Sequence, residues 1–295
     1  MRKYCFIDDS VSGIGGTSLT LNAIVEPERK NVDFVPTREF SLKQAFSEYD
    51  FFILGNITSF DKNSYDSIMT MMEDKPFVKI EFDYGYCIFR GRIPHQLLGG
   101  EKCNCMDSQK GNEELINLYN SIKFYSHHMF YMSEEQMKMH NDDLLGFDSR
   151  KKSILSSCFS SENMLSFENL RNKTKNEKYA IIDGQGGWHT QAKGIKESIK
   201  YAENNNLKFD LIKTETHNKM LDKLSEYKGI ITLPIIHDTC PRITIEARLM
   251  GLEVITNEFS QHIKEKWWKG SDRKVYEYIK SRPSFFWDKI KCLKY

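Results

Sequence analysis

Two carboxylates that flank a predicted helix start are the side chains of this sequence best placed to do chemistry. Asp238 and Glu246 stand eight positions apart, with Pro241 between them. Pro241 fits the first turn of a helix because it lacks the N–H that would go unbonded there. Backbone N–H groups at such a helix start bind phosphate, and the two acids could accept hydrogen bonds from hydroxyls on either side. The pattern predicts a nucleotide-sugar site; the alternative is a solvated helix start with ordinary surface acids.

Two short apolar runs, residues 229–233 and 252–256, enclose this helix. Runs of this length joined by a helix indicate a βαβ unit. In an open parallel sheet, ligands bind outside the carboxyl ends of the strands. The acids and the helix start therefore fall where a ligand would sit.

The segment resembles the donor-site motif of GT-B glycosyltransferases, most closely glycosyltransferase family 4. That motif is a carboxylate, seven residues, Glu-Ala, and a Gly before the next strand; Asp238, Glu246, Ala247 and Gly251 stand in these places. The resemblance implies that Asp238 orients the sugar and Glu246 the ribose. The first acid is usually Glu, so Asp238 departs from the motif by one methylene. The resemblance also places three intervening residues at the donor: Cys240, Pro241 and Arg242.

A second motif of the same family lies upstream, where Lys193 and Gly194 match its Lys-Gly pair. Gly187 is the glycine six positions before the lysine, and Trp188 stands where the family has an arginine. In the family the arginine and lysine neutralise the donor diphosphate. The resemblance therefore implies that Lys193 carries this role with a substitute for the missing cation. The alternative is a solvated lysine at a helix start.

A glycine-rich loop follows the first apolar run, residues 4–7. Gly15 and Gly16 would let the backbone approach a ligand closely, since glycine has no side chain. Family members often have Gly-Gly between their first strand and helix. The resemblance thus places both glycines beside the donor; the alternative is a plain strand-to-helix turn.

Further residues are candidates for the acceptor side. Asp83 directly follows a predicted strand, and the family often has a His-Asp pair near this place, where Phe82 and Asp83 stand. The resemblance implies that Asp83 positions the acceptor hydroxyl. Arg90 or Arg92 is a candidate to bind an acidic acceptor, and His127, at the end of another predicted strand, is a further acceptor-side candidate. A structural role is the alternative for each.

The seven cysteines are odd in number and scattered, which indicates reduced thiols and a cytoplasmic protein. Cys87, Cys103 and Cys105 form the only tight group. A zinc site would need a fourth ligand, with His95 as the candidate, but the spacing is irregular. With no convincing Asp-x-Asp motif either, we expect no metal and no cofactor.

Alternating strands and helices in the first half of the chain predict an α/β domain with a parallel sheet. Strands are predicted at 32–35, 51–54, 77–82, 122–127 and 153–158, and helices at 41–48, 64–73 and 134–141. No apolar run is long enough to span a bilayer. The N-terminus turns acidic before a signal-peptide apolar region could form.

The length of 295 residues suits two domains. We expect a Rossmann-like acceptor-side domain at 1–170, a charged linker at 168–177, a nucleotide-sugar-binding domain at 178–262 and a helical segment at 263–295. The resemblance implies the GT-B fold. In that fold, two Rossmann-like domains with parallel sheets face each other across a cleft, and the last helix crosses back to the first domain.

Residues 262–295 hold ten Lys/Arg and four Asp/Glu, interleaved with aromatic side chains. Such a segment could hold the protein on an anionic membrane surface or on nucleic acid. The favoured alternative is that the aromatics pack as the crossover helix while the cations face water.

The motifs and the resemblance together predict a metal-independent glycosyltransferase that moves a hexose or pentose, and the resemblance implies that the transfer is retaining. Its donor would be a UDP- or GDP-sugar and its acceptor a hydroxyl of a glycan or lipid-linked glycan. One alternative is a viral-type DNA-base glycosyltransferase of the same fold, supported by the basic aromatic segment. The other is a non-catalytic nucleotide- or sugar-binding module, supported by Trp188 and Phe82 where polar residues are expected.

Overall fold

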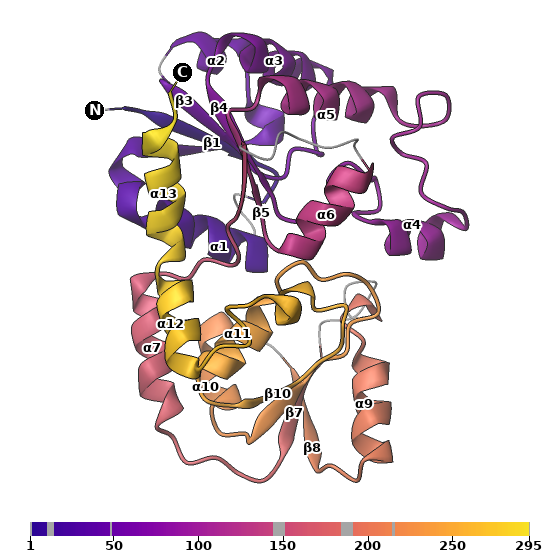
Figure 1. Cartoon of the computed structure of the whole chain (residues 1–295), viewed down its shortest axis with the longest axis vertical. Coiled ribbons are helices and arrows are strands. Elements are labelled where there is room, and N and C mark those ends of the chain that lie inside the picture. Colours follow the sequence, from indigo (N-terminus) through magenta and orange to yellow (C-terminus); the bar gives the residue numbers. More distant parts are fainter. Residues whose placement is uncertain are drawn as a thin grey trace. The chain divides into compact units, whose positions relative to one another are not determined.

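The computed structural model describes residues 2–10, 15–47, 49–143, 151–183, 191–213 and 216–294. The chain divides into two compact units (Figure 1). The first comprises residues 1–158 and 281–295, and the second comprises residues 159–280.

A six-stranded parallel sheet forms the centre of the first unit, in the order β2-β1-β3-β4-β5-β6. Its strands are β1 (Tyr4–Asp8), β2 (Val32–Pro36), β3 (Phe51–Leu54), β4 (Phe77–Glu81), β5 (His128–Tyr131) and β6 (Lys152–Ile154). The four central strands are buried along their whole length, as expected when helices cover both faces. The strand order reverses between β1 and β3, and ligands bind outside the carboxyl ends at such a reversal.

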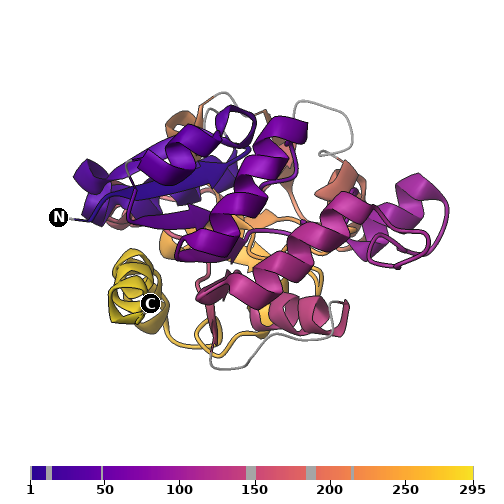
Figure 2. The same cartoon turned by 90° about the horizontal axis from the view of Figure 1, so that it is seen from above.

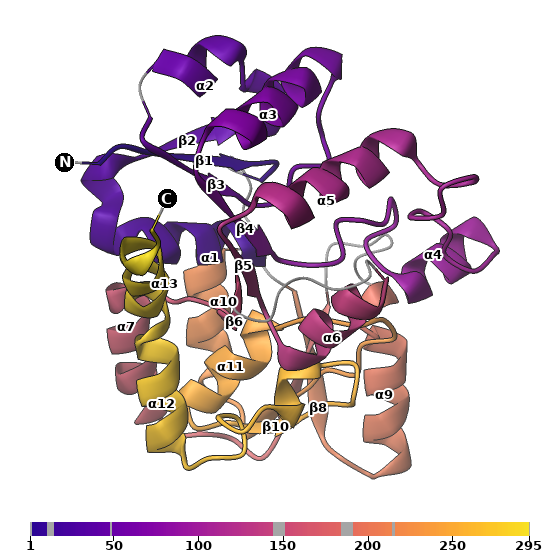
Figure 3. The same ribbon diagram turned by 45° about the horizontal axis from the view of Figure 1, so that its top comes forward.

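Helices cover both faces of this sheet. The group on one face is α2 (Leu42–Ser47), α3 (Lys62–Asp74) and α5 (Glu113–Tyr125); Figure 2 looks down onto these helices. The group on the other face is α1 (Gly16–Val25) and α13 (Arg282–Cys292), as Figure 3 shows. The described part of the unit also contains two further helices, α4 (Arg92–Gly99) and α6 (Glu134–Asp143), and two short 3-10 turns, Glu26–Asn31 and Thr37–Glu39.

The last helix, α13, belongs to the first unit. Trp287 is buried, and its indole Nε1 donates a hydrogen bond to the carbonyl of Ile24, 2.7 Å away. Phe286 packs against Phe130 of β5, with ring centroids 4.8 Å apart. These contacts confirm that the last helix returns to the first domain, and that two aromatics of the basic segment are buried as packing residues.

The second unit contains a four-stranded parallel sheet in the order β10-β9-β7-β8. Its strands are β7 (Tyr179–Asp183), β8 (Phe209–Lys213), β9 (Gly229–Ile231) and β10 (Glu253–Ile255). Its helices are α7 (Ser161–Arg171), α9 (Ile195–Asn204), α10 (His217–Leu224), α11 (Arg242–Leu249) and α12 (Asp272–Lys280), with a 3-10 turn at Gln261–Lys264. The order reverses between β7 and β9, so a ligand site is expected at their carboxyl ends.

Three features differ from the sequence predictions. The strand predicted at 122–127 is wrong: Leu118, Tyr119 and Ile122 recur at helical spacing and lie buried along α5, and the strand begins at His128. The helix α7 packs on α11 and lies in the second unit, although the predicted boundary is residue 170. Likewise α12 lies in the second unit, so the segment 263–295 is divided between both units.

No helix of the described residues is long and apolar enough to cross a membrane.

Candidate functional site

Lys193 and Asp238 form an ion pair in the second unit, beyond the carboxyl ends of β7 and β9. The ammonium is more than half exposed, whereas the carboxylate is mostly buried. A cation in this position is available to a ligand at the strand ends, and the pairing brings together the two residues predicted to act on the donor.

Gly194 explains how Lys193 reaches Asp238. Its φ is +66°, and a Cβ there would lie 1.6 Å from the carbonyl oxygen of Leu233, which follows β9. Only glycine tolerates both conditions. The turn is held further by a hydrogen bond from the Leu233 N–H to the Ser198 hydroxyl (3.0 Å) and one from the Ile235 N–H to the Ala192 carbonyl (3.1 Å).

The loop that carries Asp238 is tied to the chain beyond β10. The Asp238 N–H donates to the Phe259 carbonyl at 2.8 Å, and the Gln261 N–H donates to the Asp238 carbonyl at 3.0 Å. Helix α11 begins four residues later at Arg242, with Pro241 as its N-cap. The first N–H groups of a helix have no acceptor within it, so this start is suited to phosphate. Cys240 is buried beside Pro241.

Glu246 lies inside the second unit with 1% exposure. Its carboxylate contacts His217 Nε2 at 2.9 Å and Arg242 Nε at 3.4 Å. The Arg242 guanidinium also lies over the Phe159 ring, 3.9 Å from its centroid. Arg242 therefore packs inward against Phe159 and Glu246, an arrangement that supports α11.

Two histidines of the second unit had no sequence signal. His217 begins α10 and contacts Glu246. His262 is fully buried, and burial lowers its pKa to about 3, so its ring is neutral. Its Nε2 lies 3.0 Å from the Thr244 hydroxyl on α11. Both contacts join segments distant in sequence, and both hold the helix that begins beside Asp238.

The predicted glycines fall in different places. Gly187 lies outside the described residues. Gly15 is the N-cap of α1, and Gly16 is its first residue; both are exposed beyond the carboxyl end of β1. A Cβ at Gly15 would meet nothing within 4 Å, so open space surrounds this position within the described structure.

A second group of polar side chains lies at the strand reversal of the first unit. The Asp8 carboxylate at the end of β1 is buried and accepts hydrogen bonds from the Ser10 N–H (2.7 Å) and the Asn56 N–H (2.6 Å). Burial raises the pKa of Asp8. A Cβ at Gly55 would lie 2.1 Å from the Asp8 carboxylate, so this approach requires glycine after β3.

Arg90 joins three segments at this edge. Its guanidinium contacts the Asp83 carboxylate at 3.0 Å, the Thr58 hydroxyl at 2.8 Å and the Asp9 carboxylate at 3.6 Å. Burial raises the pKa of Asp83 although Arg90 opposes the shift. The structure thus brings together the predicted acceptor residues Asp83 and Arg90, and it adds Asp9, which the sequence did not single out.

A buried ionic network lies beneath Asp83. The Glu81 carboxylate contacts Lys79 Nζ at 3.2 Å, and both side chains are at most 1% exposed. Tyr119 donates to the same carboxylate at 3.0 Å, and the Gly85 N–H at 2.7 Å. Burial acts to raise the pKa of Glu81, but the Lys79 ammonium and the hydrogen bonds outweigh it and hold this pKa at about 2. The network anchors the turn that presents Asp83.

His127 lies at the opposite edge of the sheet. β5 begins at His128, so both histidines stand at its amino end, whereas Asp83 follows the carboxyl end of β4. The prediction that His127 follows a strand is wrong because residues 113–125 form α5. The structure therefore does not bring His127 to Asp83 and Arg90.

No protein-family model matches the sequence, and no curated protein matches it. Several solved structures are similar. The structure of Anabaena HepE in complex with UDP has 11% identity and a TM-score of 0.57, covering 99% of this chain and 100% of that chain. AviGT4, a glycosyltransferase involved in avilamycin A biosynthesis, has 10% identity and a TM-score of 0.54, covering 99% and 97%.

An alpha-glucosyltransferase in complex with UDP and a 13-mer DNA containing an HMU base is also similar. It has 8% identity and a TM-score of 0.52, with 98% of each chain covered. At these identities the likeness shows the fold alone. It confirms the predicted GT-B fold of two α/β domains, while membership of family 4 stays a prediction.

Proposed function

We propose that the protein is a glycosyltransferase that uses a nucleotide-activated sugar. The observation that carries the proposal is the Lys193–Asp238 pair beside the start of α11, where the strand order of the second unit reverses. A diphosphate at the helix start would gain the backbone N–H groups and the Lys193 ammonium together. The GT-B fold supports this proposal because the similar structures include the glycosyltransferase AviGT4, an alpha-glucosyltransferase with UDP bound and HepE with UDP bound.

The chemistry follows from where charge develops. A retaining transfer passes through an oxocarbenium-like transition state, while negative charge builds on the leaving diphosphate. Lys193 would stabilise that charge electrostatically. Asp238, mostly buried beside it, would hold a sugar hydroxyl and orient the donor.

The acceptor residues of this proposal are Asp83 and Arg90. Asp83 is one-third exposed and has a raised pKa, so it is suited to accept a proton from an attacking hydroxyl. Arg90 orients Asp83 and supplies positive charge for an acidic acceptor. The acceptor class would be a hydroxyl of a glycan or lipid-linked glycan.

A DNA hydroxyl is a second candidate acceptor, since one similar structure holds DNA and the segment 262–295 is basic. A band-shift assay with duplex DNA decides between them. Binding that salt abolishes favours DNA, whereas no shift at low salt leaves the glycan acceptor.

We expect UDP or GDP to raise the melting temperature of the protein without an added divalent cation. At a nucleotide concentration 100 times Kd, the stabilisation would be about 2.7 kcal/mol. Thermal unfolding is measured in buffer without chelator, with the free nucleoside as control because it lacks the diphosphate. Stabilisation that requires Mg²⁺ or Mn²⁺ would refute donor binding independent of metal.

Glu246→Gln is expected to weaken nucleotide binding by about 1–3 kcal/mol, the usual contribution of a hydrogen bond to a charged group. The amide can still accept from His217, but the buried Arg242 guanidinium loses the Glu246 counter-charge, so thermal unfolding is measured on the same variant to show that it is folded. Titration calorimetry measures Kd, and Glu253→Gln is the control because Glu253 starts β10, at the opposite end from the ligand edge. An unchanged Kd in Glu246→Gln would show that this carboxylate serves only the packing of α11.

A further inference from the structure

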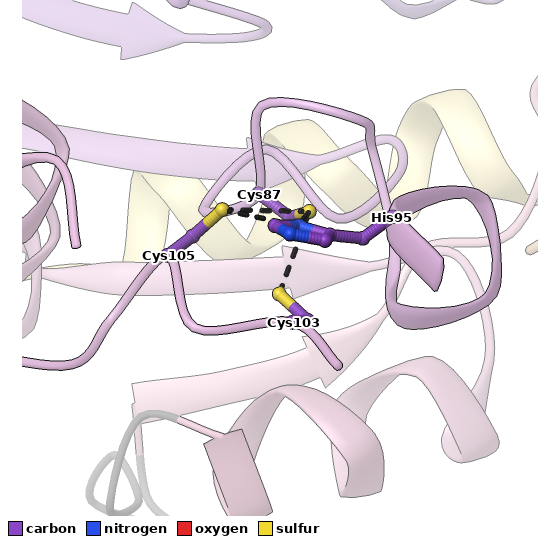
Figure 4. Close-up of side chains that lie close together, drawn as sticks. All are labelled: Cys87, His95, Cys103 and Cys105. Carbon is purple, nitrogen blue, oxygen red and sulfur yellow. Dashed lines mark hydrogen bonds between the residues drawn. The ribbon is translucent and has the colours of Figure 1, made fainter. Parts of the chain in front are cut away.

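Three cysteines and a histidine converge in the long connection between β4 and α5. Cys87 follows a turn after β4, His95 lies on α4, and Cys103 and Cys105 follow that helix. Figure 4 shows their sulfur atoms gathered around the imidazole. All four donor atoms lie within 4.8 Å of one another. We refer to these four residues as the Cys₃His cluster.

The distances match the edges of a tetrahedron around one metal ion. Zn–S bonds of about 2.3 Å and Zn–N bonds of about 2.0 Å place neighbouring sulfurs about 3.8 Å apart, and sulfur and nitrogen about 3.5 Å apart. The Cys87 sulfur lies 3.6 Å from that of Cys103 and 3.8 Å from that of Cys105. His95 Nδ1 lies 3.4 Å from the sulfurs of both Cys87 and Cys105.

These separations disfavour two other arrangements. A disulfide requires sulfurs about 2.0 Å apart, and all three cysteines have free thiols. An iron–sulfur cluster places its cysteine ligands around several iron atoms and would spread the sulfurs further than one ion does. Three thiolates and one imidazole are a common ligand set of structural zinc sites, and soft thiolates favour zinc over magnesium or calcium.

Two buried tyrosines, Tyr84 and Tyr86, hold the start of this connection in the core, whereas only Pro94 and His95 of α4 are buried. Residues 82–112 connect β4 to α5 with α4 as their only helix, an unusual length for a connection. Ile88, Leu97 and Leu98 are each about half exposed, so the apolar side chains of this segment cover only part of a core. A metal ion bound by ligands from the beginning, middle and end of this connection would hold these parts together.

We propose that the Cys₃His cluster binds one Zn²⁺ that staples the connection between β4 and α5. The sequence reads Cys-x₇-His-x₇-Cys-x-Cys, a spacing unlike the usual zinc motifs, and this proposal reverses the expectation that the chain holds no metal. Cys87, His95 and Cys105 are buried, while Cys103 is partly exposed. A cavity of about 450 Å³ borders Cys103 and Asn104 and gives an entry path.

The bound zinc ion would also help to position the candidate acceptor residues. Arg90 lies in the turn between Cys87 and His95, at a φ of +60° that non-glycine residues rarely adopt. Two ligands of the cluster flank this turn, with Cys87 three residues before Arg90 and His95 five residues after it. Zinc at the cluster would hold the turn that directs Arg90 toward Asp83. The zinc proposal itself does not depend on glycosyl transfer.

Elemental analysis of the full chain, purified without a histidine tag from zinc-supplemented medium, tests the proposal. We expect about one zinc per chain, and a several-fold loss of zinc in Cys103→Ser. Cys292→Ser is the matched control because Cys292 is exposed on α13, and it should keep the full content. Wild-type protein that is folded but carries no zinc overturns the proposal, as does full zinc content in Cys103→Ser.

Cobalt gives a second measurement that does not depend on a variant folding. Co²⁺ added to the metal-free chain should give the visible absorption bands of a tetrahedral site with thiolate charge transfer, and one equivalent of Zn²⁺ should abolish them. The melting temperature should fall on chelation and recover with Zn²⁺. Octahedral cobalt bands, no bands, or a disulfide among the cluster cysteines found by mass spectrometry would each overturn the proposal.

Discussion

Lys193→Ala is expected to lower sugar transfer by about 10²–10³-fold, the usual loss when one group that stabilises developing charge is removed. Its melting temperature should stay near that of the wild type. The ammonium is more than half exposed, and its pairing with Asp238 contributes little to folding. Release of nucleoside diphosphate from the donor and thermal unfolding are measured on the same purified protein.

Lys200→Ala is the matched control, because Lys200 is an exposed lysine on α9, the helix that begins two residues after Lys193. It should leave transfer unchanged. Near-normal transfer by Lys193→Ala would remove this lysine from the site, and with it the match to the family's Lys-Gly motif. A wild-type protein that binds nucleotide but shows no turnover with any donor would favour the non-catalytic binding module.

Glu81→Gln is expected to destabilise the first unit by about 3–5 kcal/mol, since it leaves the buried Lys79 ammonium without its counter-charge. Chemical denaturation measures the free energy of unfolding. Glu73→Gln, an exposed position on α3, should change it by less than about 0.5 kcal/mol. Adding Lys79→Met to Glu81→Gln should recover part of the loss; additive losses would contradict the proposed charge pairing.

The same pair predicts a pH dependence. The pKa of Glu81 is about 2 in the folded protein and near 4.5 in its ordinary range, so the folded state binds this proton less tightly than the unfolded state does. Its contribution to stability is therefore complete above about pH 4.5 and is lost as the pH falls toward 2. In Glu81→Gln the free energy of unfolding should fall less steeply as the pH is lowered from about 4.5 toward 2.

The fold class could be predicted because its signals are local. Apolar runs such as 51–54 become buried parallel strands, and the segments at 193–194 and 238–246 carry their spacing in the chain itself. The error at 122–127 arose because a short apolar run fits a strand or a buried helix equally well. Here the helical spacing of Leu118, Tyr119 and Ile122 prevailed.

Contacts between distant segments could only come from the tertiary structure. Asp9, Asp83 and Arg90 meet because parallel strands bring their carboxyl ends to one edge of the sheet. The order of the strands in the sheet cannot be predicted from the spacing of residues along the chain. The Cys₃His cluster has the same origin: α4 turns His95 back onto cysteines before and after it. By itself the sequence determined most of the strands and helices, and it predicted where a phosphate would bind. The tertiary structure decided which side chains share a site. Side chains at the strand ends meet only when their strands become neighbours in the sheet.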